Sequence, residues 1–225
     1  MNEQIQLFLI YFPAFLFAIS FHESAHGWVA YRFGDDTAKR LGRISLNPIR
    51  HMDFIGTFLF PVTLFFSPGL RIPIGGWAKP VPVNPLNMKN PRRDNLWVAF
   101  AGPISNIILA LLCAGFIRLL FYSLPLLDHL GVSSLSFINS SIEVLYAFLK
   151  ISILINLGLA FFNLIPFHPL DGGKVIEGLL PASYVGVYNR IANYGFLFIF
   201  ALYYLGAFRY LFLPVRYIAN ILIPV

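Results

Sequence analysis

The sequence has very little cysteine, few charged residues and few acidic ones. Its single cysteine, Cys113, excludes an intrachain disulfide, and its place in an apolar run is typical of a packing residue. Charged residues make up only 12% of the 225 residues, and 10 acidic side chains stand against 16 basic ones. There is no low-complexity segment, domain linker or internal repeat, which excludes a modular or repeat architecture. We therefore expect a single domain over residues 1–225.

What the sequence has in abundance is apolar chain. The apolar fraction is 58% and the mean hydropathy is +0.72, whereas soluble domains are about 45–50% apolar. Both values indicate an integral membrane protein. The net charge of +6 would also suit nucleic acid, but the basic residues lie mostly in short loops beside apolar runs, as the positive-inside rule describes. We expect the lipid bilayer as the partner of this surface, and no nucleic acid.

Four apolar stretches are long enough to cross a hydrocarbon core about 30 Å thick, which takes about 20 helical residues. A fifth, Phe54–Phe66, is short and contains Pro61, which predicts a re-entrant or interfacial piece. The first run is too long for a cleaved signal peptide and lacks its basic start. The sequence predicts an all-α membrane protein, a polytopic helix bundle of about four to five spans, the clear ones being residues 5–31, 95–122, 142–166 and 191–213.

The loop charges predict an orientation. The N-terminus carries only Glu3, whereas five basic residues follow the first span: Arg32, Lys39, Arg40, Arg43 and Arg50. The loop 123–141 contains no lysine or arginine. By the positive-inside rule the N-terminus lies outside, and the loops after the first and third spans are cytoplasmic. Arg209 and Arg216 fit this pattern less well, so the path of the chain after about residue 209 stays open.

Residues 71–87, between the first two spans, are rich in proline. Prolines at 73, 80, 82 and 85 exclude a helix, and the pair Gly75–Gly76 favours a turn. The segment predicts extended, β-like chain, in the form of a hairpin whose unpaired edge receives an extended peptide by strand addition. A proline-rich connector on the membrane surface is the equal alternative.

Residues 20–28, Ser-Phe-His-Glu-Ser-Ala-His-Gly-Trp, carry the main chemical signal. His22 and His26 are four residues apart, so a helix places them on one face, one turn apart. Two imidazoles in that arrangement can bind one Zn²⁺, with Glu23 as the general base. All three lie near the end of a long apolar run, where ionisable side chains are costly in lipid and therefore indicate function.

A catalytic zinc keeps one position for water and needs a third protein ligand. His22 lies roughly 26 Å along a helix from Ile5, near the cytoplasmic side of the core. The third span ends on the same side, where prolines stop the helix and Gly172–Gly173 permits a sharp turn. Asp171 at that turn is the expected third ligand.

Other candidates for the third ligand are placed elsewhere by the same reasoning. Asp128 and His129 fall on the outer side. His51 and Asp53 follow the basic loop and are expected at the interface. His168 is only three residues from Asp171, and it is left open as a ligand, a neighbour of the ligands or an interfacial residue.

These motifs resemble those of the site-2 protease family, the intramembrane zinc metalloproteases. His22-Glu23-Ser24-Ala25-His26 is similar to the zinc-binding motif of the family. Asn163 to Gly173 resembles its second signature, an Asn followed by a proline-rich stretch ending in Leu-Asp-Gly, and Gly102 to Asn106 resembles its Gly-x-x-x-Asn element. The resemblance covers about residues 15–180, in a compact form without room for the PDZ or nucleotide-sensing CBS domain of larger members.

The resemblance implies one zinc per chain and hydrolysis of peptide bonds within or beside transmembrane helices, in the cell membrane with the site toward the cytoplasm. Asn163 and Asn106 are expected to bind the oxyanion or the substrate backbone, or else to bond between helices. Gly102 and Gly115 would permit close helix approach, or would let one helix move aside for substrate. Two alternatives are a metal transporter, which usually has repeats, and an inactive scaffold, which would have lost a motif residue. The substrate and the oligomeric state stay open.

Overall fold

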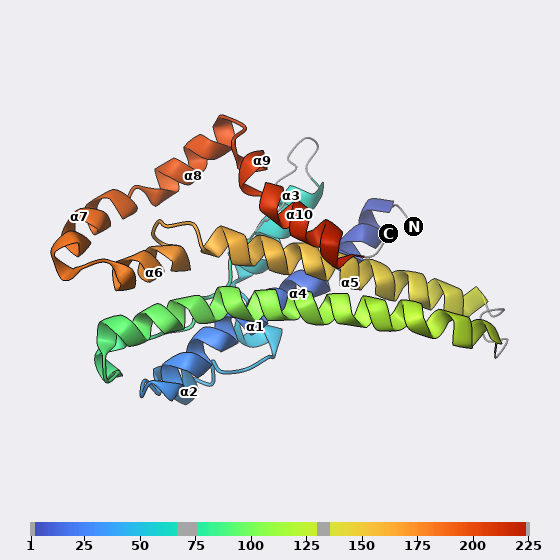
Figure 1. The fold of residues 1–225 in the computed structure, drawn as a ribbon, viewed down its shortest axis with the longest axis horizontal. Coiled ribbons are helices and arrows are strands. Elements are labelled where there is room, and N and C mark those ends of the chain that lie inside the picture. Colours follow the sequence, from blue (N-terminus) through green and yellow to red (C-terminus); the bar gives the residue numbers. More distant parts are fainter. Residues whose placement is uncertain (1–2, 67–75, 130–135, 224–225) are drawn as a thin grey trace.

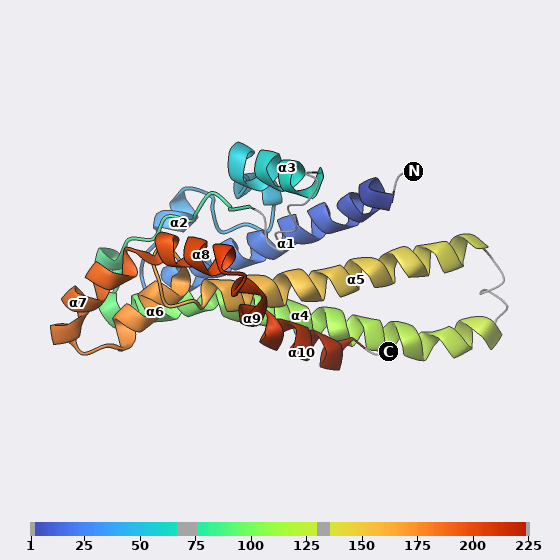
Figure 2. The ribbon, with the colours of Figure 1, turned by 90° about the horizontal axis from the view of Figure 1, so that it is seen from above.

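Three long helices form the body of the protein in the computed structural model, which describes residues 3–66, 76–129 and 136–223. They are α1 (Glu3–Arg32), α4 (Pro91–His129) and α5 (Ser136–Asn163). Helices α4 and α5 run antiparallel and side by side, and α1 packs against both (Figure 1, Figure 2). Each of the three is long and apolar enough to cross a membrane, so the first three predicted spans correspond to candidate membrane helices.

The fourth predicted span, residues 191–213, is not one continuous helix, and the candidate span in this region begins earlier, at residue 182. Helices α7 (Ala182–Ala192) and α8 (Gly195–Tyr204) are bent by 49° at the residues between them. The described chain therefore has three candidate spans, or four if this pair counts as one. After α9 (Phe208–Leu211), α10 (Leu213–Leu222) packs on α4 and α5. The chain after residue 209 thus returns to the bundle (Figure 1).

The faces of the long helices differ sharply in side-chain size and exposure. Where α4 meets α5 and α10, the buried residues include the small Ala110, Ala114 and Ala219. On the outer face of α4, four large apolar side chains are more than half exposed: Leu111, Leu112, Phe116 and Leu119. A soluble protein would expose such a surface to water at a high cost, whereas lipid is a suitable neighbour for it.

Several short elements lie beside the long helices. Most are near the C-terminal half of α1, whereas Phe65 and Phe66 contact Phe8 near its start. The fifth apolar run forms a π-helical turn, η2 (Phe54–Leu59), and α3 (Phe60–Phe66), which together are too short to span. The Asp53 side chain caps η2 by accepting a hydrogen bond from the Gly56 N–H. The other short elements are α2 (Thr37–Arg40), η1 (Pro48–Arg50), η3 (Pro85–Asn87) and α6 (Asp171–Leu179).

Residues 76–84, which we call the strap, contain neither helix nor β-strand, and no β-strand occurs elsewhere in the described residues. Three alternate N–H groups of the strap bond inward to the body. Trp77 donates to the Gly56 carbonyl and Lys79 to the His51 carbonyl, while Val81 donates to the Glu23 carboxylate. The predicted β-like hairpin is therefore not found in this part of the segment. Its residues 71–75 lie outside the described chain.

Candidate metal centre

Three candidate ligands from two distant parts of the chain converge at one point. His22 and His26 lie one turn apart on α1, and Asp171 is the first residue of α6. Asp171 Oδ2 is 3.1 Å from His22 Nε2 and 3.2 Å from His26 Nε2, and the two Nε2 atoms are 3.1 Å apart. All three side chains are buried. The structure thus brings together the three residues that the sequence predicted as ligands.

The protons of the two imidazoles point away from this meeting point. His22 Nδ1 is 2.6 Å from Asn106 Oδ1, and His26 Nδ1 is 2.6 Å from the Val98 carbonyl oxygen. Both partners are acceptors, so each Nδ1 must carry its proton and donate it. In the neutral imidazoles the Nε2 atoms are therefore unprotonated. Two lone pairs and a carboxylate face one another, an arrangement that only a cation or an added proton can satisfy.

This donor set and its spacing fit a zinc ion. Two ligand atoms about 2.0–2.1 Å from a tetrahedral zinc lie roughly 3.3 Å apart, close to the separations found between these three atoms. Helix α4 leaves room at the same point because residue 102 is glycine. A Cβ atom on Gly102 would lie 2.6 Å from His22 Nε2 and closer still to His26 Nε2. A Cβ atom on Gly115, by contrast, would meet nothing within 4 Å, so its predicted role in close helix packing is not found.

The charge of Asp171 depends on its two neighbours. Burial alone would raise the pKa of the Asp171 carboxyl, but positive charge on His26 and His22 lowers it below its usual range. The carboxylate form is therefore favoured only while a positive charge lies beside it. A metal ion supplies that charge, and its binding would displace any proton held on a histidine Nε2.

Glu23 lies between the ligands in sequence and bonds to the strap. Its carboxylate accepts a hydrogen bond of 2.8 Å from the Val81 N–H. The next residue, Ser24, donates to the carbonyl of Ser45 in the loop after α1. The motif is thus contacted on two sides. The two histidines face α4 and α6, whereas Glu23 and Ser24 bond to the strap and to the loop after α1.

Asn106 is completely buried and its amide is fully engaged. Besides its contact with His22, its Nδ2 donates to the Ala18 carbonyl at 3.1 Å and to Asn156 Oδ1 at 2.7 Å. A side chain in that position bonds between helices α1, α4 and α5. This placement agrees with the interhelical reading of Asn106 and leaves its amide no free atom for substrate.

Asn163 lies at the end of α5 and is half-buried. Its Nδ2 donates to the Leu159 carbonyl one turn earlier, at 3.0 Å. One amide proton is used in this way, and a primary amide carries two.

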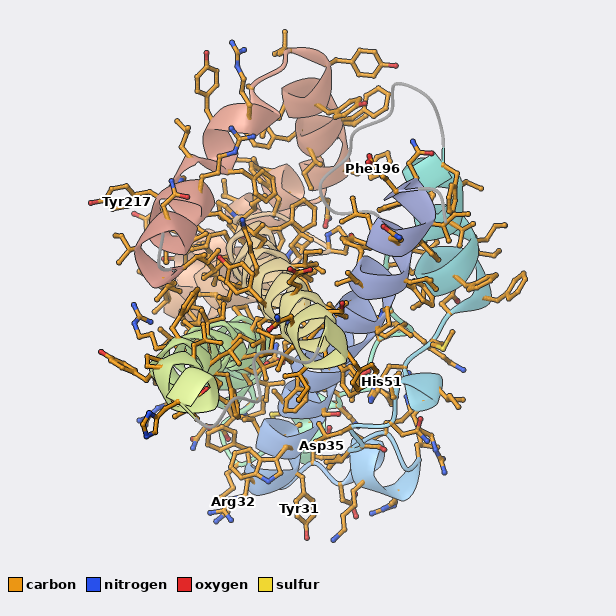
Figure 3. All side chains as sticks on the ribbon, turned by 90° about the vertical axis from the view of Figure 1, so that its right-hand side faces the viewer. Tyr31, Arg32, Asp35, His51, Phe196 and Tyr217 are labelled. Atoms are coloured by element: carbon orange, nitrogen blue, oxygen red, sulfur yellow. The ribbon has the colours of Figure 1, made fainter. Side chains whose placement is uncertain are left out.

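His168 does not join the metal centre. Its Nε2 is 3.3 Å from Asn189 Oδ1, and its ring contacts Tyr188, so the side chain faces α7. His51 is also elsewhere, and it is completely buried within the protein. Its Nε2 is 2.7 Å from the Ser45 carbonyl, and burial lowers the pKa of its ring. Tyr31 and Arg32 point outward at the end of α1, unlike Asp35 and His51 (Figure 3).

Three groups around the site were not predicted from the sequence: Asn156, the Val98 carbonyl and the Val81 N–H. Asn156 could have been noticed in the sequence, since it is a polar residue inside an apolar span and such residues usually have a hydrogen-bond partner. The two backbone groups had none, because every residue has a carbonyl and nearly every residue an N–H.

Comparisons with known proteins agree with this chemistry. The model of peptidase family M50 matches residues 10–206. The candidate zinc metalloprotease YwhC of Bacillus subtilis (strain 168) is 39% identical over 186 residues, which cover 83% of this chain and 76% of that protein. The candidate zinc metalloprotease Rip2 of Mycolicibacterium smegmatis is 24% identical over 88% of this chain and 68% of its own length. Rip2 of Mycobacterium tuberculosis (strain H37Rv) is 29% identical over 76% and 57%. No solved structure matches significantly.

Proposed function

This chain belongs to peptidase family M50, the site-2 protease family, and from that membership and its metal centre we propose that it hydrolyses peptide bonds within or beside transmembrane helices of membrane proteins. The observation that carries the proposal is the convergence of two imidazole Nε2 atoms and a carboxylate oxygen, buried in a membrane protein beside a glutamate. Residues 1–225 would act as one catalytic domain.

We assign the metal ligands as His22, His26 and Asp171, which would bind one zinc ion per chain. When bound, zinc supplies a water of lowered pKa, about 7, and a Lewis acid for the peptide carbonyl. Glu23 takes the proton of the attacking water and delivers it to the leaving amine. Glu23 is the residue after His22, and the hydrogen bond from the Val81 N–H limits the directions in which its carboxylate can point.

The two asparagines take different roles in this proposal. Asn163 offers its second amide proton to the oxyanion or to the substrate backbone. Asn106 orients His22, because its amide is committed to the helices and does not reach substrate.

The proposed orientation places the N-terminus outside and the metal centre toward the cytoplasm. The basic residues that follow α1 support it, since loops rich in Lys and Arg stay on the cytoplasmic side. A substrate chain that paired with the strap would meet no N–H at Pro80 or Pro82, and it would find the Pro80 carbonyl already bonded to Arg43. The proposed partners are transmembrane proteins whose cleaved segment is locally unwound, because the carbonyls of an intact helix are already hydrogen-bonded.

The test uses the full chain, purified in detergent, with zinc content and cleavage of a helical membrane peptide measured together. We expect Glu23→Gln to keep one zinc per chain and to lose about 10²–10⁴-fold in cleavage rate, the contribution of a general base. Equal cleavage by the variant would overturn the role of Glu23. If the wild type cleaves no peptide of a broad panel while metal crosses liposomes that contain it, the protein is a transporter and the proposal fails.

A further inference from the structure

Asn156 is a buried polar residue for which the proposed chemistry has no direct use. It lies in α5, within an apolar span, and is 3% exposed. A primary amide in such a place is costly unless its donors and acceptor are paired. Both ends are paired here. Asn156 Oδ1 accepts from Asn106 Nδ2 at 2.7 Å, and Asn156 Nδ2 donates to the Ser152 carbonyl at 2.9 Å.

Two backbone carbonyls determine the donor and the acceptor of every hydrogen bond between Asn156, Asn106 and His22. The Ser152 carbonyl only accepts, so the NH₂ group of Asn156 faces it and the Oδ1 atom faces Asn106. The Ala18 carbonyl also only accepts, so the NH₂ group of Asn106 faces it and the Oδ1 atom faces His22. The series of hydrogen bonds thus runs from the Ser152 carbonyl through the two amides to His22.

We propose that Asn156 is a positioning residue for the metal ligand His22, acting through Asn106. Resting on the proposed function, this inference adds to it a residue of α5 that determines which nitrogen of His22 is free. With Asn156 in place, both protons of the Asn106 amide are bonded and its oxygen is directed at His22 Nδ1. That contact keeps the proton on Nδ1 and leaves Nε2 as the ligand atom.

Losing the Asn156 acceptor leaves one buried proton of Asn106 unpaired. The Asn106 amide then gains by rotating toward another acceptor, and His22 loses its fixed tautomer and ring orientation. Residues that orient a ligand in this way typically contribute 10–100-fold to metal affinity. Because Asn156 acts one residue further away, we expect the lower end, a loss of about 10-fold in zinc affinity.

A purely structural role would give a different result. Asparagines in spans often bond helices together, and losing such a bond lowers stability without changing the metal site of the folded protein. The measurements must therefore include the metal site itself. We choose the zinc dissociation constant, from competition with a chelator, and the visible absorption of bound Co²⁺, which reports the ligand geometry.

Two substitutions remove the acceptor in different ways. In Asn156→Ser the hydroxyl can donate to the Ser152 carbonyl four residues earlier but is too short to reach Asn106. In Asn156→Leu an apolar side chain of similar size keeps water out of the gap. Asn156→Asp is the conservative variant, because a protonated carboxyl keeps both the acceptor and the donor. Ser152→Ala is the matched control, since it removes a buried hydroxyl of α5 and keeps the carbonyl that Asn156 uses.

All proteins are measured as the full chain in detergent. We expect zinc to bind about 10-fold more weakly to Asn156→Ser and Asn156→Leu, with an altered Co²⁺ spectrum, while Asn156→Asp and Ser152→Ala stay near the wild type. Wild-type affinity and spectrum in whichever of the Ser and Leu variants folds would overturn the inference. Neither measurement needs proteolysis. A wild-type protein that binds zinc but cleaves nothing would therefore refute the proposed function, while the metal measurements would still decide the role of Asn156.

Discussion

The two sides of the motif in α1 are supported in different ways. On the bundle side, His22 and His26 are oriented by groups of α4: the Asn106 side chain and the Val98 carbonyl. On the loop side, Glu23 and Ser24 bond to backbone groups of the strap and of the loop after α1. The bundle side is built from long, packed helices, whereas the loop side is built from irregular chain.

This difference separates the two chemical tasks of the site. Metal ligands must keep their geometry, and helices packed inside a membrane provide it with few alternatives. The carboxylate of Glu23 must exchange a proton with water and with substrate, which requires a less enclosed place. We infer that substitutions on the bundle side remove the metal, and that substitutions on the loop side keep the metal and slow the reaction.

The loop side has its own anchor in Asp35, which is completely buried. Its carboxylate accepts hydrogen bonds from Thr37, from the Asn84 N–H and from Asn87. Burial alone would raise the pKa of Asp35, but these bonds lower it below its ordinary value. A lowered pKa means that Asp35 stabilises the fold above the pKa of the unfolded chain, and that this support is lost as the pH falls through the lowered value.

The largest expected effect is on the bundle side. Asp171→Ala removes a ligand and leaves two imidazoles, so we expect zinc and cleavage to be lost together. His168→Ala, three residues earlier, should keep most of both, because the His168 ring faces α7. The measurements are zinc content by elemental analysis and the rate of peptide cleavage, on both variants. Full zinc content in Asp171→Ala would move the third ligand elsewhere.

A nearly equal effect is expected from one added methyl group. Gly102→Ala places a Cβ against both histidine Nε2 atoms, so we expect zinc affinity to fall by about 100-fold or more, as with other changes that displace ligands. Gly115→Ala is the control on the same helix, since it meets nothing within 4 Å. The measurement is chelator competition on both variants. Equal affinities would mean that α4 does not approach the site as closely as described.

The smallest expected effect tests the loop side. Arg43 donates from Nη2 to the Lys79 carbonyl at 2.7 Å and to the Pro80 carbonyl at 3.2 Å, which ties the loop after α1 to the strap. Arg43→Met removes these bonds, and at about 1 kcal/mol net for a hydrogen bond we expect cleavage to slow by roughly 3–10-fold.

Zinc affinity should be unchanged in Arg43→Met, because the strap does not touch the ligands. Arg40→Met is the matched control. Arg40 is an exposed arginine nearby that pairs with Asp36 in its own helical turn. A loss of zinc in Arg43→Met would erase the proposed difference between the two sides.

The parts of the site that local pattern determines were predictable from the sequence. The spacing of His22 and His26 follows from helical periodicity, and Asp171 follows from the direction of the third span and the turn after it. The pairing of Asn106 with Asn156 was not, because it depends on the register between α4 and α5, which neither helix encodes alone. The burial of His51 was not predictable for a similar reason: it arises when the loop folds back against α1, and the sequence of the loop is polar on average.

The two prolines at the centre of the strap also affect how the protein behaves at high concentration in a membrane. An exposed extended chain normally invites a second copy of itself, because each edge offers both donors and acceptors. Beyond Ala78, the outward positions of this edge are Pro80 and Pro82, which have carbonyls but no N–H. The Pro80 carbonyl is moreover bonded to Arg43, so a second copy that met the strap here would find no free donor at either proline. The segment next to Glu23 is thus protected against self-association without a covering helix.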